Sequence, residues 1–200
     1  GGTQWDEGIE HRASGAGWLH AYEHPLLAVL HNPIHGNFQP DTMRLWEAET
    51  EDENPLRDGY MKLGVRHLRT VREIPVPVVT AGQRVRYAIL CAMEVYSKPE
   101  WIMWAEGWLS GRDRSAAAAA AATAWAVAWA WAAAAVLAAE AAVNAVWVEK
   151  LSTKSKAQAA AAAEMAARAA AAAAEMAARA AQAELGLPRL AERAIAEDKP

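Results

Sequence analysis

Four histidines lie close together near the start of the chain: His20, His24, His31 and His35. Histidine is the side chain most often used for proton transfer and metal binding near neutral pH. Residues four apart converge on one face of a helix, but on a strand they lie roughly 13 Å apart, too far to share one ion. Because Pro25 and Pro33 disfavour a helix through either pair, we expect ordinary strand and turn histidines.

A metal site is the alternative for these histidines. His31 and His35 are the candidate ligands, since a loop can fold them together. Cys91 is the single cysteine, which excludes an internal disulfide and a cysteine zinc cluster. No histidine lies near Cys91 in the sequence, so we expect a structural cysteine rather than a nucleophile. The sequence therefore favours no metal and no other cofactor.

The N-terminal half alternates acidic and basic segments. Residues 44–53 are acidic, and residues 57–72 are basic. A groove for a polyanion is one interpretation of the basic segment. Pairing of the basic strand beside the acidic one is the interpretation we favour. If this half binds a ligand, the candidate contacts are His20, Arg66 and Arg69.

The elements that would position these side chains form an α+β fold with a small β-rich N-terminal domain. Residues 1–17 are expected to be a flexible lead-in, and alternation predicts strands at 18–22 and 44–49. The apolar run at 26–30 is short and is broken at His31-Asn32-Pro33. A capping box from Thr80 to Gln83 begins a helix that extends to about residue 96. We thus expect one mixed domain over 18–96.

Residues 97–200 are expected to be helical and rich in alanine, with helices at about 98–109, 113–150, 156–185 and 189–197. The first of these helices carries Trp101, Trp104 and Trp108 on one face, which is typical of a core-facing stripe. Gly111 permits a tight turn, and Asp113 or Ser115 can cap the helix that follows. Residues 160–170 and 171–181 are identical, an eleven-residue repeat that nearly keeps helical phase. The last two long helices would form a long helical hairpin.

The predicted helix at 113–150 carries Trp125, Trp129 and Trp147 within one narrow sector, as expected of a packing seam. Its uncharged part is long enough to span a bilayer. However, alanine is only weakly lipophilic, and the tryptophans lie mid-span rather than at membrane interfaces. A membrane helix is therefore possible in principle but is not favoured. The net charge of −4 likewise gives no general attraction to nucleic acid.

Two segments resemble a known type of protein. They are Gly17-Trp-Leu-His-Ala-Tyr22 with Asn32-Pro-Ile-His35, and Trp104-Ala-Glu-Gly-Trp-Leu-Ser-Gly-Arg-Asp-Arg-Ser115 before the polyalanine. Together they resemble an uncharacterised family encoded mainly by bacteriophages and prophages, over most of residues 17–125. The resemblance implies a viral source and transfers no activity and no site.

The function expected from the sequence is that of a non-enzymatic phage accessory or virion protein. It would act through helix-mediated assembly or contact with another protein, in the virion or the host cytoplasm. One alternative is a ligand-binding or enzymatic module in the β-rich half. A second alternative is a membrane-associated helical protein.

Overall fold

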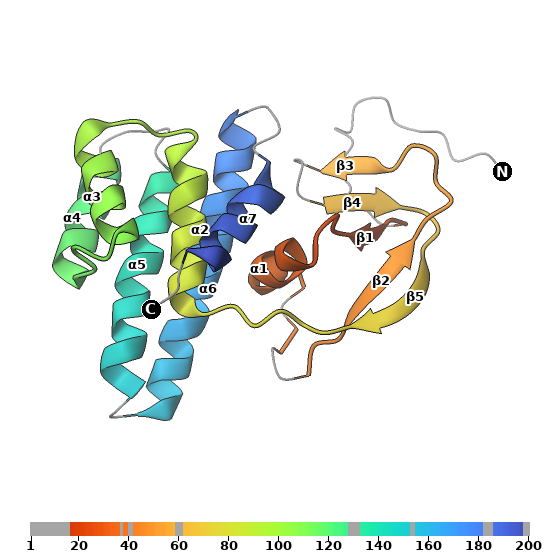
Figure 1. The fold of residues 1–200 in the computed structure, drawn as a ribbon, viewed down its shortest axis with the longest axis horizontal. Helices are drawn as coiled ribbons and strands as arrows, with labels where there is room; N and C mark the ends of the chain where they lie inside the picture. The colour runs from red at the N-terminus through yellow and green to blue at the C-terminus, as the bar shows by residue number, and fades with distance from the viewer. Residues whose placement is uncertain are drawn as a thin grey trace.

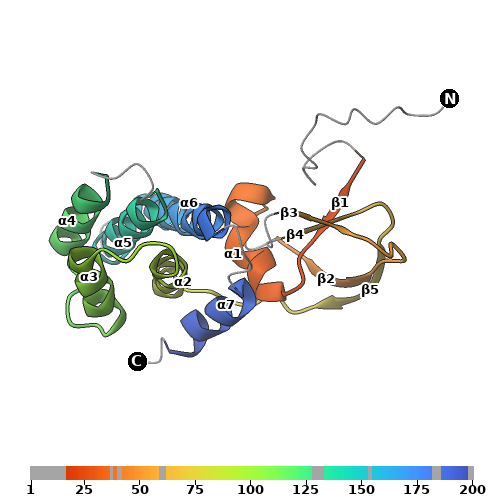
Figure 2. The ribbon, with the colours of Figure 1, turned by 90° about the horizontal axis from the view of Figure 1, so that it is seen from above.

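The chain folds as an α+β protein in the computed structural model, which describes residues 17–36, 38–39, 42–58, 62–127, 133–152, 155–181 and 186–197. Helices form one side of the molecule and two small antiparallel sheets form the other, with helix α1 between them (Figures 1 and 2). The α+β class and the N-terminal position of the strands agree with the sequence-based prediction.

The strands form two separate sheets. β1 (Leu19–Ala21) pairs with β4 (Lys62–Val65), which also pairs with β3 (Leu56–Asp58). β2 (Leu45–Glu49) pairs with β5 (Arg69–Ile74) in a two-stranded ribbon. Glu47 of the ribbon pairs with Arg72 at 2.5 Å, and Glu49 pairs with Arg69. The expected pairing of an acidic with a basic strand is therefore confirmed.

Helix α1 (Pro25–His35) contains His31 and His35 and contradicts the expectation that they are strand or turn residues, whereas His20 lies on strand β1 as expected. Pro25 is tolerated because it occupies the first turn, where its missing N–H has no partner to lose. Pro33 lies inside the helix and cannot donate to the carbonyl of Val29. Arg84 of the next helix donates to that carbonyl instead, at 3.2 Å from Nη1. A residue distant in sequence thus donates to the Val29 carbonyl that Pro33 leaves without its helical partner. The helix therefore continues through a proline that was expected to break it.

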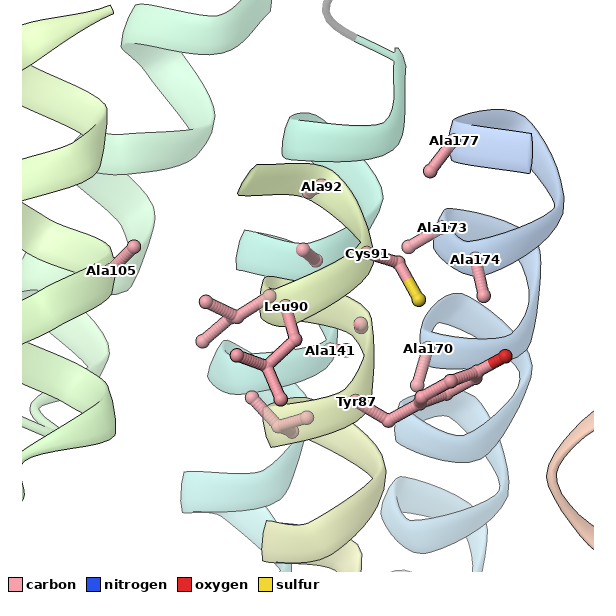
Figure 3. Close-up of a cluster of buried hydrophobic side chains, with 14 of the residues drawn as sticks. Tyr87, Leu90, Cys91, Ala92, Ala105, Ala141, Ala170, Ala173, Ala174 and Ala177 are labelled. Atoms are coloured by element: carbon pink, nitrogen blue, oxygen red, sulfur yellow. The ribbon is translucent and has the colours of Figure 1, made fainter. Parts of the chain in front are cut away.

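Helix α2 (Ala81–Met93) is the central helix of the bundle and packs against α3, α5, α6 and α7. It begins with the predicted Thr80–Gln83 capping box, which is confirmed. Tyr87 and Cys91 on α2 project toward alanines of α6 (Figure 3). The alanine side chain occupies little volume in the interface, so the backbones of α2, α5 and α6 can approach closely.

The remaining helices are α3 (Pro99–Leu109), α4 (Ala116–Val127), α5 (Ala133–Ser152), α6 (Lys156–Ala181) and α7 (Leu187–Ala196). The prediction of one helix over 113–150 is wrong, because α4 and α5 are separate helices that pack against each other. A single long helix would leave the alanine surface of residues 116–127 in water, whereas in the fold Ala119 and Ala122 are buried. α5 and α6 pack side by side (Figure 1).

The tryptophan stripe of α3 is buried. Trp101, Trp104 and Trp108 are 0%, 7% and 3% exposed. Before α4, Gly111 has φ 77°, Asp113 accepts from the Ser115 amide, and Ser115 accepts from the Ala118 amide.

Trp129 and the side chains of Trp125 and Trp147 lie outside the described part of the structure. Among the described helices, none is both long and apolar enough to cross a bilayer.

Candidate functional site

Three aromatic rings stack where α1 meets the first strand. Tyr22 lies 6.2 Å from His31 and 6.1 Å from His35, and the two histidine rings are 5.6 Å apart, all measured between ring centroids. The histidines converge because α1 is helical and places residues four apart on one face. His20 and His24 are not part of this stack: β1 carries His20, and His24 caps the start of α1.

A chain of polar contacts runs through His35. The Tyr22 hydroxyl lies 2.5 Å from His35 Nδ1, and His35 Nε2 lies 3.6 Å from a carboxylate oxygen of Glu175 on α6. A carboxylate beside Nε2 favours a proton on that nitrogen, so Nδ1 accepts from the Tyr22 hydroxyl. The neighbouring His35 imidazole, followed by the nearby Arg179 charge, lowers the pKa of Glu175 despite its partial burial. We call Tyr22, His35 and Glu175 the proton chain.

His31 lies deeper than the proton chain. Its Nε2 lies 3.2 Å from the hydroxyl of Tyr87, and burial lowers its pKa to about 3. His31 is therefore neutral over the physiological range. Burial also raises the pKa of the Tyr87 hydroxyl and of the Cys91 thiol. Because the thiolate is the nucleophilic form, Cys91 is not activated here.

Three of the four ring nitrogens of the two candidate metal ligands have polar neighbours, and the buried His31 Nδ1 has no hydrogen-bond partner among the described residues. His35 faces Tyr22 and Glu175 on its two nitrogens, and His31 Nε2 faces Tyr87. The described residues contain no group of three or more histidine, cysteine or carboxylate side chains arranged to hold an ion. The geometry therefore favours hydrogen bonding over metal binding for this pair.

An open cleft of about 660 Å³ lies between β1, the end of α1 and the start of β2. A cleft of this size accommodates a small organic ligand. We call it the N-terminal cleft, and its described lining consists of Trp18, Leu19, His20, Tyr22, Ala28, Asn32, Ile34, His35, Gly36, Phe38, Met43, Arg44, Leu45 and Lys62. Two members of the proton chain, Tyr22 and His35, thus border it.

The polar lining of the N-terminal cleft is basic. Arg44, Lys62 and two histidines line it, and no carboxylate occurs among the described lining residues. Arg44 pairs with Glu73, which lies outside the lining. A second cleft, of about 600 Å³ between the ribbon and the start of α1, differs because Glu23 and Glu47 line it. Those carboxylates pair with Arg57 and Arg72. The N-terminal cleft is therefore the one suited to an anion.

The structure separates the candidate ligand contacts of the sequence. His20 lines the N-terminal cleft. Arg66 is not a lining residue, but its guanidinium lies 4.9 Å from the ring centroid of Trp18, which lines the cleft. Arg69 pairs with Glu49 on the ribbon and does not join them.

The most informative residue missed by the sequence is Glu175. It lies in the second copy of the repeat, and Glu164 occupies the same position in the first copy. Both glutamates pair with an arginine four residues later, but the Glu164 side chain is 62% exposed and the Glu175 side chain only 19%. Identical local sequences give no signal for this difference, which arises from contact with α1.

Comparisons of the chain with models of protein families, with curated proteins and with solved structures gave no match.

Proposed function

We propose that the N-terminal half is a binding module for a small anionic ligand held in the N-terminal cleft. The observation that carries this proposal is that Lys62, His20 and His35 line the cleft, with no carboxylate among the described lining residues. Arg44 also lines it and pairs with Glu73, which is not a lining residue. A ligand in such a cleft is attracted by charge and held by hydrogen-bond donors.

The proton chain adds a chemical property to this site. The Tyr22 hydroxyl lies beside His35 Nδ1, and the Glu175 carboxylate lies beside His35 Nε2, so a hydroxyl, an imidazole and a carboxylate stand in line. Tyr22 borders the cleft, so a bound ligand lies next to a hydroxyl whose proton can move. Binding is the function proposed, and this arrangement equips the same site for acid–base chemistry.

Binding of inorganic pyrophosphate tests the proposal. We expect calorimetry to detect binding and NMR to show shifts of the His20 and His35 imidazole signals. Lys62→Gln should weaken binding about tenfold, because one charge-assisted contact is lost. Arg69→Gln is the matched control, since Arg69 lies on the ribbon outside the lining. No detectable binding, or equal weakening by both substitutions, would contradict the proposal.

A second candidate function is protein contact, by self-association or with another protein. The β2–β5 ribbon favours it, because Trp46 and Val71 are 42% and 51% exposed there. A two-stranded ribbon has only marginal stability in water, so a partner would stabilise it. The resemblance to a phage-encoded family supports an accessory or virion role in the virion or host cytoplasm, and an α5–α6 hairpin would be its scaffold.

Light scattering at several concentrations tests this candidate. Trp46→Glu should lower the average mass of any assembly, whereas Met103→Glu, on the exposed side of α3, should leave it unchanged. A monomeric mass for the parent at every concentration would exclude self-association, and contact with a different protein would be the remaining form of this candidate.

A further inference from the structure

Phe38 is the only phenylalanine of the chain, and it is 65% exposed. Large exposed rings are common enough to need no explanation by themselves. This ring differs because two hydrogen bonds fix its backbone. The Phe38 amide donates to Asn32 Oδ1 at 2.9 Å, and Asn32 Nδ2 donates to the Phe38 carbonyl at 2.8 Å. The amide of Asn32 thus acts as a clamp that holds an exposed aromatic residue in place.

Gly36 provides the space for the ring. A Cβ built on Gly36 would lie 2.7 Å from Cε2 of Phe38, closer than real Cβ contacts allow. The φ of Gly36 is −112°, which any residue can adopt, so the requirement for glycine is one of space rather than conformation. The ring of Phe38 therefore lies directly against the end of α1.

Phe38, Asn32 and Gly36 all line the N-terminal cleft. Trp18 also lines it, and the guanidinium of Arg66 lies over that indole. The cleft therefore combines aromatic rings with the basic side chain of Lys62 and with Arg44, which pairs with Glu73. Flat rings stack on aromatic side chains, and anions pair with cationic ones.

We propose that the ligand of the N-terminal cleft is an anion carried on a planar ring, with the ring against Phe38 and the anionic group toward Lys62 and His35. Nucleotides and aromatic carboxylates share this chemistry. The inference rests on the proposed anion binding, to which it adds the class of ligand. The cleft volume of about 660 Å³ is adequate for a ligand of either kind.

The test is calorimetry with AMP, ribose 5-phosphate, benzoate and acetate as probes. We expect AMP to bind at least about tenfold more tightly than ribose 5-phosphate, since stacking of one base contributes roughly that factor or more. If aromatic carboxylates are the natural class, benzoate should exceed acetate by a similar factor. The two probe pairs thus distinguish the two sources of the same chemistry.

Substitutions assign the preference to the clamped ring. Phe38→Ala should remove the advantage of AMP over ribose 5-phosphate while leaving ribose 5-phosphate binding unchanged. Gly36→Ala should have the same effect, because its methyl group displaces the ring. Val78→Ala, at a 90% exposed position outside the cleft lining, is the control and should change nothing.

The outcomes separate this inference from the proposed function. Equal affinity for anions with and without an aromatic ring would overturn the inference and leave anion binding intact. A ring preference that survives both Phe38→Ala and Gly36→Ala would also overturn it. If neither these probes nor pyrophosphate bind, both proposals are overturned.

Discussion

His31 is a buried histidine whose pKa is strongly lowered by its burial. The imidazole is fully buried, and its pKa falls from 6.5 to about 3 on folding. Between these two pH values the unfolded chain binds more protons than the folded chain. Stability therefore decreases as pH falls from about 6.5, by at most about 1.4 kcal/mol per pH unit from this group.

We predict that His31→Gln flattens this pH dependence. Glutamine can still hydrogen-bond the Tyr87 hydroxyl but does not titrate. Urea unfolding of both proteins at several pH values between 4.5 and 7.5 should show that their stability difference is largest at pH 7 and narrows toward pH 4.5. Parallel curves would mean that His31 is not the group responsible.

Arg84 is predicted to be coupled to Pro33. In the parent, Arg84→Met leaves the Val29 carbonyl without its donor, which should cost about 1–3 kcal/mol. In a Pro33→Ala background the new amide of residue 33 can donate to that carbonyl, so Arg84→Met should cost less. A double-mutant cycle measured by urea unfolding gives the coupling, and full additivity would contradict the prediction.

At the scale of single elements, α3 is anchored by tryptophan whereas α6 is buried through alanine. Trp101 is completely buried and packs against Tyr96 and Trp104, at centroid distances of 5.6 and 5.4 Å. We predict that Trp101→Ala destabilises the protein by about 3–5 kcal/mol, because a large cavity remains. Met103→Ala on the same helix should change stability little, since Met103 is 65% exposed. Thermal and urea unfolding of both variants would check this.

The sequence predicted elements well where local signals agree with packing. The Thr80–Gln83 capping box, the tryptophan periodicity of α3 and the charge complementarity of β2 and β5 each report a contact made nearby or between matched strands. The prediction failed at α1, where Arg84 from a distant helix satisfies the carbonyl that Pro33 leaves free. It also failed for 113–150, because alanine favours helix equally along the whole segment and does not mark where the chain separates into α4 and α5.

The candidate site was predicted only in part for the same reason. His20, His31 and His35 attract attention by residue type, and Arg66 by charge. Glu175 and Phe38 acquire their surroundings through contacts with α1, and the local sequence of neither residue indicates them. The sequence identified the candidate side chains, but only the helical conformation of α1 brings His31 and His35 into contact with each other.

At the scale of the whole molecule, α1 joins the two parts of the fold. Its N-cap His24 and its two own histidines contact three helices of the bundle. His24 lies 3.2 Å from Glu192 of α7, His31 contacts Tyr87 of α2, and His35 approaches Glu175 of α6. One continuous core also extends from Leu27 of α1 to Ala194 of α7. Helix α1 and the bundle are therefore connected through side chains far apart in sequence.

This connection predicts the result of truncating the chain after Lys150. The truncation removes α6 and α7, and with them the alanines that cover Tyr87 and Cys91 and the buried Leu187 and Leu190. α2 would then expose its apolar face, and α1 would lose Glu175 and Glu192. We expect the truncated chain to lose amide-exchange protection in α1 and α2 and the near-ultraviolet circular dichroism of its tryptophans. Truncation after Glu197, which keeps both helices, is the matched control and should preserve both signals. Full protection of α2 in the shorter chain would instead show that residues 18–96 fold independently.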